Sequence, residues 1–477
     1  MSKFNLQNEL LDRARLAKQL EDYLGAEKLV KRAIALTRQE GGPEEHTITR
    51  YLTRELAGIH VKAGSPKKAE NAWKSHLKSL RQIKKNTETE QLEISKTMVQ
   101  MALFYQSQDL ARQAKIRYGQ ALKIQEPLFS KENPDYVLTL SEYARILCRE
   151  GKRRKAESLF LEALKLAENI LGDWDEYVAL VLRRRALAFK GLVNPELLEP
   201  YLERAVAILA DDSASPHPEL SKSLAELADL SLERGYVRRA EKLYVKSYQL
   251  SEGVLGSKHK DSVSILTRLA RLRRSLRKYE EAESHFRKIL TVARQVGNSR
   301  SLKVARALRD LGSLLVEKRD YEKAEPFLLE ALDIQQSILG RDHVDLARTL
   351  IELASLHKSQ NNFNLAEVEY KRALKIRGNA PMAVADTLTG LALLHQARKQ
   401  HAPAEKLLLQ ALSIKEEAFG PEAPQLVETL NKLGSVYENL LEVDRAIEFY
   451  ERANVIEIQQ HGFYCRLWLD PDESNKT

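Results

Sequence analysis

The sequence predicts an all-α protein, a right-handed α-solenoid of about eleven helix–turn–helix pairs. Three observations lead to this fold class. A short block recurs along the chain at a nearly constant interval, apolar residues inside each block are spaced three to four positions apart, and Gly or Pro residues fall between the blocks. A single pair is too small to bury its own apolar face, so each pair must pack on its neighbours.

The recurring block is marked by an Ala that is usually followed by Glu, as in Tyr-Glu-Glu-Ala-Glu at 279–283 and Tyr-Glu-Lys-Ala-Glu at 321–325. One such anchor residue occurs in each unit: Ala26, Ala69, Ala114, Ala156, Leu198, Ala240, Ala282, Ala324, Ala366, Ala404 and Ala446. Successive anchors are separated by 43, 45, 42, 42, 42, 42, 42, 42, 38 and 42 residues. This step predicts one continuous array over residues 1–461, with 462–477 as a C-terminal cap or tail.

Within one unit the pattern predicts two helices. The apolar residues of 262–276 follow a helical spacing, and the segment 279–289 repeats that spacing after a short turn. Turn-forming residues then separate successive units, as in Gly256-Ser-Lys-His, Gly340-Arg-Asp-His and Gly420-Pro-Glu-Ala-Pro. The unit is therefore helix, turn, helix and connector.

This pattern resembles the tetratricopeptide repeat. Leu-Gly-x-x-His, an Ala-rich first helix, Tyr-x-x-Ala-Glu and Ala-Leu-x-Ile are similar to the 42-residue kinesin-light-chain and nephrocystin subtype over roughly residues 5–460. Barely one helix precedes Ala26, so we do not expect a kinesin light chain with its motor-binding heptads. The subtype's paired Asn residues on the first helices are also mostly replaced, and only Asn431 remains.

Composition and motifs argue against an enzyme, a cofactor or a metal site. Two cysteines, Cys148 and Cys465, are too few for a disulfide framework or a Cys-based metal centre. No His pair has the spacing of helical metal ligands, and no phosphate-binding loop or nucleophile motif is present. His60, His357 and His395 lie nine residues before an anchor, where Tyr105 and Tyr437 also occur, which indicates a packing position.

Three further histidines, His217, His259 and His343, fall in connectors, where local hydrogen bonding at the next helix start explains them. The N-terminus lacks a signal-peptide core, and no apolar run approaches the ~18 residues that a membrane helix needs. We therefore expect a cytoplasmic protein without membrane insertion.

Charge points to the function. The net charge of +9 combines +16 over residues 1–400 with −7 over 401–477, and residues 251–300 alone carry 12 Lys or Arg against 5 Asp or Glu. The resemblance implies that a concave groove is lined by residues about 18, 15, 14, 11, 8 and 7 positions before each anchor. These positions hold Glu226, Asp229 and Glu233 in the sixth unit, and elsewhere the arginines Arg145, Arg149, Arg183, Arg184, Arg268, Arg271, Arg274, Arg306, Arg309 and Arg348.

An Arg-lined groove predicts an interaction scaffold or adaptor that binds an acidic peptide or protein segment, because guanidinium groups bind carboxylates in a bidentate geometry. The alternatives are charges that are only solvated and offset by Glu three or four residues away, an RNA-binding solenoid, or a regulatory solenoid. RNA is disfavoured because the groove positions lack aromatic residues for base stacking. The partner's identity and the oligomeric state are left open.

The tail has two interpretations. Phe463, Tyr464 and the Trp468-Leu469 pair are apolar enough to cap the last helix pair. Alternatively, Trp468-Leu-Asp-Pro-Asp-Glu473 resembles the tryptophan-plus-acidic peptides that kinesin-light-chain grooves bind, which would make the tail a weak autoinhibitor.

Overall fold

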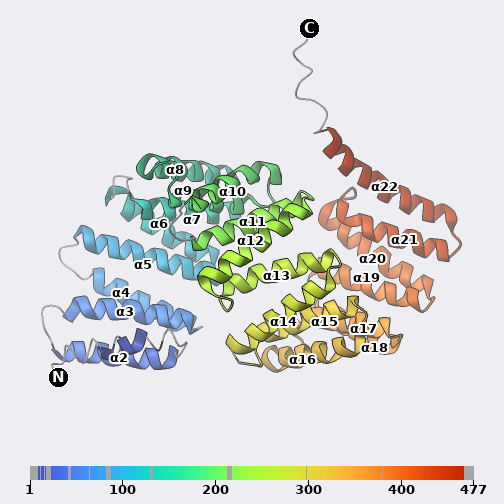
Figure 1. Cartoon of the computed structure of the whole chain (residues 1–477), viewed down its shortest axis with the longest axis horizontal. Helices are drawn as coiled ribbons and strands as arrows, with labels where there is room; N and C mark the ends of the chain where they lie inside the picture. Colours follow the sequence, from blue (N-terminus) through green and yellow to red (C-terminus); the bar gives the residue numbers. More distant parts are fainter. Residues whose placement is uncertain are drawn as a thin grey trace, which may run out of the picture. The chain divides into compact units, whose positions relative to one another are not determined.

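The computed structural model describes residues 9–10, 12–15, 17, 23–40, 45–63, 65–81, 87–128, 133–211, 217–296, 298–378 and 380–466. Over these residues the regular structure is entirely helical, which confirms the predicted all-α solenoid of paired helices (Figure 1). The chain divides into two compact units, residues 1–250 and 251–477.

Unit 1 contains α2 (Tyr23–Glu40), α3 (Glu45–Lys62), α4 (Pro66–Arg81), α5 (Glu88–Ser107), α6 (Ala111–Leu128), α7 (Pro134–Arg149), α8 (Arg153–Leu171), α9 (Glu176–Phe189), α10 (Pro195–Ala210), α11 (Pro218–Glu233) and most of α12 (Val237–Leu255). Unit 2 continues with α13 (Lys260–Ser275), α14 (Tyr279–Val296), α15 (Leu302–Glu317), α16 (Tyr321–Leu339), α17 (Leu346–Ser359), α18 (Phe363–Ile376), α19 (Pro381–Ala397), α20 (His401–Phe419), the 3₁₀ turn η1 (Pro424–Leu426), α21 (Val427–Asn439) and α22 (Val443–Arg466). Odd-numbered helices are the first helices of the repeats, and each packs on the even-numbered second helix that follows.

The predicted anchors are confirmed as core residues. All eleven lie in second helices and are buried, with Leu198 the most exposed of them at 3%. They are small because two helices approach closely there, and a second small residue twelve positions earlier lies on the first helix of the same pair. This position is Ala57, Ala102, Ala144, Ala186, Ala228, Ala270, Gly312, Ala354, Ala392 and Gly434. A Cβ atom on Gly312 would lie only 2.7 Å from the Leu328 side chain, so glycine is required there.

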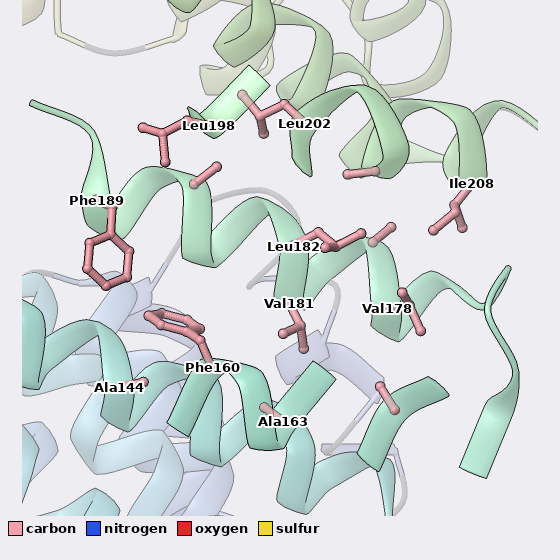
Figure 2. Packing of buried hydrophobic residues seen from close by; sticks show 14 of the residues in the cluster. Ala144, Phe160, Ala163, Val178, Val181, Leu182, Phe189, Leu198, Leu202 and Ile208 are labelled. Carbon is pink, nitrogen blue, oxygen red and sulfur yellow. The ribbon is translucent and has the colours of Figure 1, made fainter. Parts of the chain in front are cut away.

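A large side chain four positions after the anchor fills the space that the small residues leave. Phe160 in α8 is fully buried, and its ring meets Phe189 of α9 edge-on with centroids 6.2 Å apart. Figure 2 shows these two rings beside Ala144 and Ala163, with Leu182, Leu198 and Leu202 further along the same core. The core is therefore a line of similar layers, each built from two consecutive helix pairs.

The connectors end in a repeated N-cap. Asn133, Asp175, His217, His259, Ser301 and His343 follow one another at intervals of 42 residues, and each accepts a hydrogen bond from a backbone N–H two or three residues further on. For the first five residues this N–H belongs to the next helix, whereas for His343 it belongs to Asp345, the residue just before α17. The imidazole Nδ1 atoms of His217, His259 and His343 accept at 3.1, 3.2 and 3.2 Å. The prediction that these three histidines make local bonds at helix starts is confirmed.

The turn inside each repeat places one residue in the left-handed conformation. The residue five positions before the anchor has a positive φ in eight repeats, at Asp109, Gly151, Gly235, Arg277, Arg319, Asn361, Lys399 and Leu441. Glycine adopts this conformation freely, whereas other residues are strained in it, and Leu441 is the most apolar of these exceptions. The tight turn is therefore kept even where its residue is unfavourable.

The Glu that follows the anchor connects consecutive repeats. Glu70 accepts a hydrogen bond from the Tyr105 hydroxyl at 2.9 Å, and Glu405 accepts one from the Tyr437 hydroxyl at 2.7 Å. The same position is Glu157, which pairs with Arg185, and Glu367, which pairs with Arg398 at 2.6 Å. The Ala-Glu motif thus combines a buried packing residue with an acceptor for the next repeat.

The sequence also predicted a packing position nine residues before each anchor. His60, His357, Tyr105 and Tyr437 are all buried there, and His395 is half-buried, so the packing interpretation is confirmed. In the last repeat the residue after the anchor is Ile447 instead of Glu, and Ile447 is 48% exposed. The helix backbone of α22 continues through Arg466, and residues 467–477, with most of the predicted tail and its Trp468, lie outside the described residues.

Candidate functional site: the first-helix face

The first helices of successive repeats present a row of polar and apolar side chains within each unit. We call the residues 18, 15, 14, 11, 8 and 7 positions before the anchors the first-helix face. Contacts between consecutive first helices join these positions: Arg183 to Glu226, Arg274 to Glu317, and the Ser313 hydroxyl to Glu352 at 2.8 Å. The positions predicted to line one surface therefore neighbour each other across the repeats.

In unit 1 the predicted arginines of this face are mostly bound to carboxylates. Arg145 and Arg184 share Glu142, at 2.7 Å and 3.0 Å. Arg183 binds both Glu219 and Glu226, the latter through two bonds of 2.7 and 2.8 Å. Arg145, Arg183 and Arg184 are therefore already paired with carboxylates of unit 1.

Arg149 differs from the other arginines of unit 1. It lies exposed in the last turn of α7, and no carboxylate of the described residues lies within ion-pair distance of it. Burial lowers the pKa of Arg184, and the neighbouring Glu142 opposes that shift. Arg184 is thus bound within the face, whereas Arg149 is exposed to solvent.

On α13, α15 and α17 of unit 2 the face holds three carboxylates, Asp310, Glu317 and Glu352. Asp310 is shared by Arg309, at 2.8 Å, and by Arg271, at 2.9 Å. Although burial raises the pKa of Asp310, these two guanidinium groups together lower it below its ordinary value. One carboxylate therefore compensates two cations.

The remaining arginines of unit 2 divide into two groups. Arg274 binds Glu317 at 2.5 Å, and Arg268 is half-buried and makes contacts of its own. Arg306 and Arg348 are exposed, and within the part of the chain that the structure describes neither has a carboxylate within ion-pair distance. Arg348 also lies near Arg377, whose pKa is lowered mainly by burial and further by the charge of Arg348.

A pocket of about 310 Å³ opens on the unit 1 face between α5, α6, α7 and α9. Its lining comes largely from first-helix-face positions and includes the predicted Arg184: Lys96, Val99, Gln100, Leu103, Gln125, Asp135, Leu138, Thr139, Glu142 and Arg184. Sequence reasoning did not find this pocket, because Gln125 belongs to a second helix and is not a face position.

The source of the carboxylate partners was also missed. One alternative interpretation of the sequence placed Glu partners three or four residues away on the same helix, and Arg145 with Glu142 fits that pattern. Most partners come instead from the neighbouring first helix, 36 to 43 residues away, as for Arg183, Arg271 and Arg274. The signal was present, because Glu226, Asp310 and Glu317 occupy the same offsets from their anchors as the arginines do.

Among the residues that the structure describes, no group of three or more His, Cys, Asp or Glu side chains could hold a metal ion. None of the described helices is long and apolar enough to span a membrane. Cys148 is buried, its Sγ donates to the Ala188 carbonyl at 3.2 Å, and burial raises its pKa, as expected of a packing residue.

The fold and the face define a helical-repeat protein with an open, charged surface. A model of the tetratricopeptide repeat matches residues 93–169, 223–295, 261–334, 303–379 and 383–453, so the chain belongs to the tetratricopeptide repeat family. Repeats of this family generally mediate protein–protein interactions and are typically non-catalytic.

Two solved structures share the fold, and a third is similar over about half of the chain. The apo form of RapI is 16% identical with a TM-score of 0.58, over 77% of this chain and 98% of that one. A signal-transduction ATPase with a tetratricopeptide repeat sensor from Pyrococcus horikoshii is 16% identical with a TM-score of 0.52, over 76% of this chain and 54% of that one. BtubC (BKLC) from P. vanneervenii is 24% identical with a TM-score of 0.40, over 47% and 92%. A search of curated protein sequences gave no significant match.

Proposed function

We propose that this protein is a non-enzymatic interaction scaffold that binds an acidic, extended segment of a partner protein on the first-helix face of α13, α15 and α17. The observation that carries the proposal is the charge balance of this surface. Its positions hold seven cations and three carboxylates: Arg268, Arg271, Arg274, Arg306, Arg309, Arg348 and Lys358 against Asp310, Glu317 and Glu352.

The excess charge is available to a partner. Arg306 and Arg348 are exposed on α15 and α17, at equivalent positions 42 residues apart. Their guanidinium groups can each bind a carboxylate through two parallel hydrogen bonds. Asp310 already pairs with two arginines, Arg271 and Arg309. The N–H donors of the face therefore outnumber the carboxylate acceptors on it, and an incoming acidic segment can bind the remaining donors.

The test is a double variant, Arg306→Ser with Arg348→Ser, in the full-length chain. Neither residue makes an ion pair in the described structure, so the fold should keep its stability. The probe is a fluorescein-labelled peptide of alternating Glu and Ser, followed by fluorescence anisotropy. Two exposed ion pairs of about 0.2–1 kcal/mol each, or about 0.4–2 kcal/mol together, predict about two- to thirtyfold weaker binding.

The matched control is Lys375→Ser with Lys406→Ser, which removes the same charge from exposed positions on the second helices α18 and α20. Binding should also weaken as salt rises from about 50 to about 300 mM, because the Debye length shortens. Equal losses in both double variants, or binding that ignores salt, would contradict the proposal. Tighter binding of a single-stranded RNA than of the acidic peptide would favour the nucleic-acid alternative.

A further inference from the structure

A second charged surface lies in unit 1, at the turns that join the two helices of a repeat. Residues 149–155, Arg-Glu-Gly-Lys-Arg-Arg-Lys, hold five cations and one carboxylate, and all seven residues are exposed. The seven positions before any other anchor hold three cations at most. This basic run, residues 149–155, is therefore a property of one repeat and not of the repeat pattern.

The turns of the repeats on either side lie close to the basic run. Lys115, which follows the preceding turn, binds Glu150 at 2.6 Å. The Cys148 thiol, just before the run, donates to the carbonyl of Ala188, near the following turn, at 3.2 Å. Three consecutive turns therefore lie along the same edge of unit 1.

A fourth turn continues this edge. Lys190 pairs with Glu233 at 3.2 Å, and Arg234 pairs with Glu196 at 3.2 Å, so the turn after α9 and the turn after α11 contact each other. We call the four segments the turn edge: residues 109–112, 149–155, 190–196 and 233–239.

The turn edge is strongly positive. It holds ten Lys or Arg and four Asp or Glu. Three of the carboxylates, Glu150, Glu196 and Glu233, already pair with cations of unit 1. Six cations are exposed and form no ion pair with any residue that the structure describes: Arg112, Arg149, Arg153, Arg154, Lys155 and Arg238. The charge of the edge is therefore available to an anionic partner.

Exposed aliphatic side chains flank the basic run. Leu110 lies at the preceding turn and is 44% exposed, whereas Leu192 and Val193 lie at the following turn and are each 37% exposed. Burial of this apolar surface against a partner would be favourable. The turn edge thus presents a block of cations with aliphatic residues on both sides of it.

This combination distinguishes between anionic partners. RNA is disfavoured because bases stack on aromatic rings, and the aromatic residue of the edge, Tyr236, already has the Arg234 guanidinium 4.8 Å from its ring centroid. An acidic peptide would bind the cations and leave the aliphatic residues of the outer turns exposed. An anionic bilayer offers both kinds of contact, because its charged headgroups attract Lys and Arg and the layer below them accepts apolar side chains.

We propose that the turn edge of unit 1 binds the surface of an anionic lipid bilayer. The basic run contacts the headgroups, and Leu110, Leu192 and Val193 reach the boundary between the headgroups and the acyl chains. The turn edge belongs to unit 1 and the proposed acidic-segment site to unit 2, so neither proposal depends on the other.

The experiment is co-sedimentation of the full-length chain with lipid vesicles. Vesicles of phosphatidylcholine with about 30% phosphatidylserine carry a negative surface potential, whereas vesicles of phosphatidylcholine alone do not. We expect binding to the mixed vesicles to be at least about tenfold tighter than to the neutral ones, and to weaken as salt rises from about 50 to about 300 mM.

The charge of the basic run is tested by Arg153→Ser with Arg154→Ser. Each basic residue near an anionic bilayer contributes about fivefold to affinity, so this double variant should bind about thirtyfold more weakly. Neither arginine forms an ion pair in the described structure, so the melting temperature should not change.

The matched control is Lys123→Ser with Lys165→Ser, which removes the same charge from exposed positions on α6 and α8. These lysines lie about 15 Å or more beyond the turn edge along their helices, which exceeds the Debye length of about 8 Å at physiological salt. Binding should therefore weaken by less than about threefold.

The aliphatic contacts are tested by Leu192→Ser with Val193→Ser. We expect about tenfold weaker binding, and the loss should persist at about 300 mM salt because it is not electrostatic. The control, Leu365→Ser with Val368→Ser, removes two more exposed aliphatic residues from α18 and should leave vesicle binding unchanged.

Four results would overturn the proposal. These are equal binding to both kinds of vesicle, equal losses in the arginine and lysine variants, unchanged binding of the Leu192 and Val193 variant, or binding of a single-stranded RNA where the vesicles do not bind. The arginine variant should bind the acidic peptide as the unmodified chain does. A matching loss there would make the basic run a general anion site and contradict the lipid assignment, whereas failed vesicle binding would leave the test of unit 2 untouched.

Discussion

Replacing Phe160 by Ala should destabilise one part of this protein and leave the rest intact. Phe160 is fully buried in α8 and packs edge-on against Phe189 of α9, with ring centroids 6.2 Å apart and an interplanar angle of 61° (Figure 2). Truncating a buried phenylalanine costs about 3–5 kcal/mol, of which the aromatic pair supplies about 0.5–1.5 kcal/mol.

The repeat architecture determines where this loss is felt. In a solenoid each repeat contacts only its neighbours. The substitution should therefore lower the free energy of local opening in the repeats around α8 and not elsewhere. At about 1.4 kcal/mol per tenfold change, a loss of about 4 kcal/mol predicts amide exchange faster by two to three orders of magnitude in α7 to α10. Hydrogen exchange with mass spectrometry should find the peptides of α19 to α22 unchanged.

The neighbouring residue supplies the control. Leu161 lies one position further along α8 but is 51% exposed, so Leu161→Ala should change exchange by less than threefold. The reasoning would be refuted if Phe160→Ala accelerated exchange equally in α19 to α22, because the chain would then unfold as one cooperative body. It would also be refuted if α8 and α9 kept their protection.

Further predictions concern single contacts. Leu441→Gly should raise the free energy of unfolding by about 0.5–1 kcal/mol in urea titrations, because Leu441 is 86% exposed and has a φ of 63°; no gain would mean that its strain is negligible. Tyr437→Phe should cost about 1 kcal/mol in the same assay through loss of the 2.7 Å bond to Glu405, and an unchanged midpoint would show that this inter-repeat bond adds nothing. His76 is fully buried, and burial together with Arg54 and Arg50 lowers its pKa to about 4. Because the unfolded chain binds this proton near pH 6.5, stability should fall by roughly 2–3 kcal/mol between pH of about 7.5 and about 4.5, and His76→Leu should lose that part of the slope in thermal melts.

The fold was predictable from the sequence because its information is local and repeated. The anchors at 42-residue steps, the helical spacing of apolar residues and the connector histidines each depend on a few neighbouring positions. The structure confirms that every anchor is buried, that His217 and His259 cap helices, and that His343 makes a local bond just before α17. Repetition supplied independent copies of the same pattern, so one irregular unit, such as the one with Leu198, did not obscure it.

Which helices carry the face positions could also be predicted from the sequence. Which of the charges on them form ion pairs could not. Family offsets placed Arg183, Arg271 and Arg274 on first helices, but an offset does not say which carboxylate lies opposite. That depends on how consecutive helices are staggered, which brings Glu226, Asp310 and Glu317 within reach from some forty residues away.

The sequence by itself therefore determined the class of fold, the length of the repeat and the helices that present a charged face. Tertiary structure alone decided which of those charges are available. It paired Arg145, Arg183 and Arg184 of unit 1 with carboxylates and left Arg149 of unit 1 and Arg306 and Arg348 of unit 2 exposed. The physical reason is that periodic patterns specify which residues face the same way, whereas pairing and burial depend on distances between helices that are far apart in the chain.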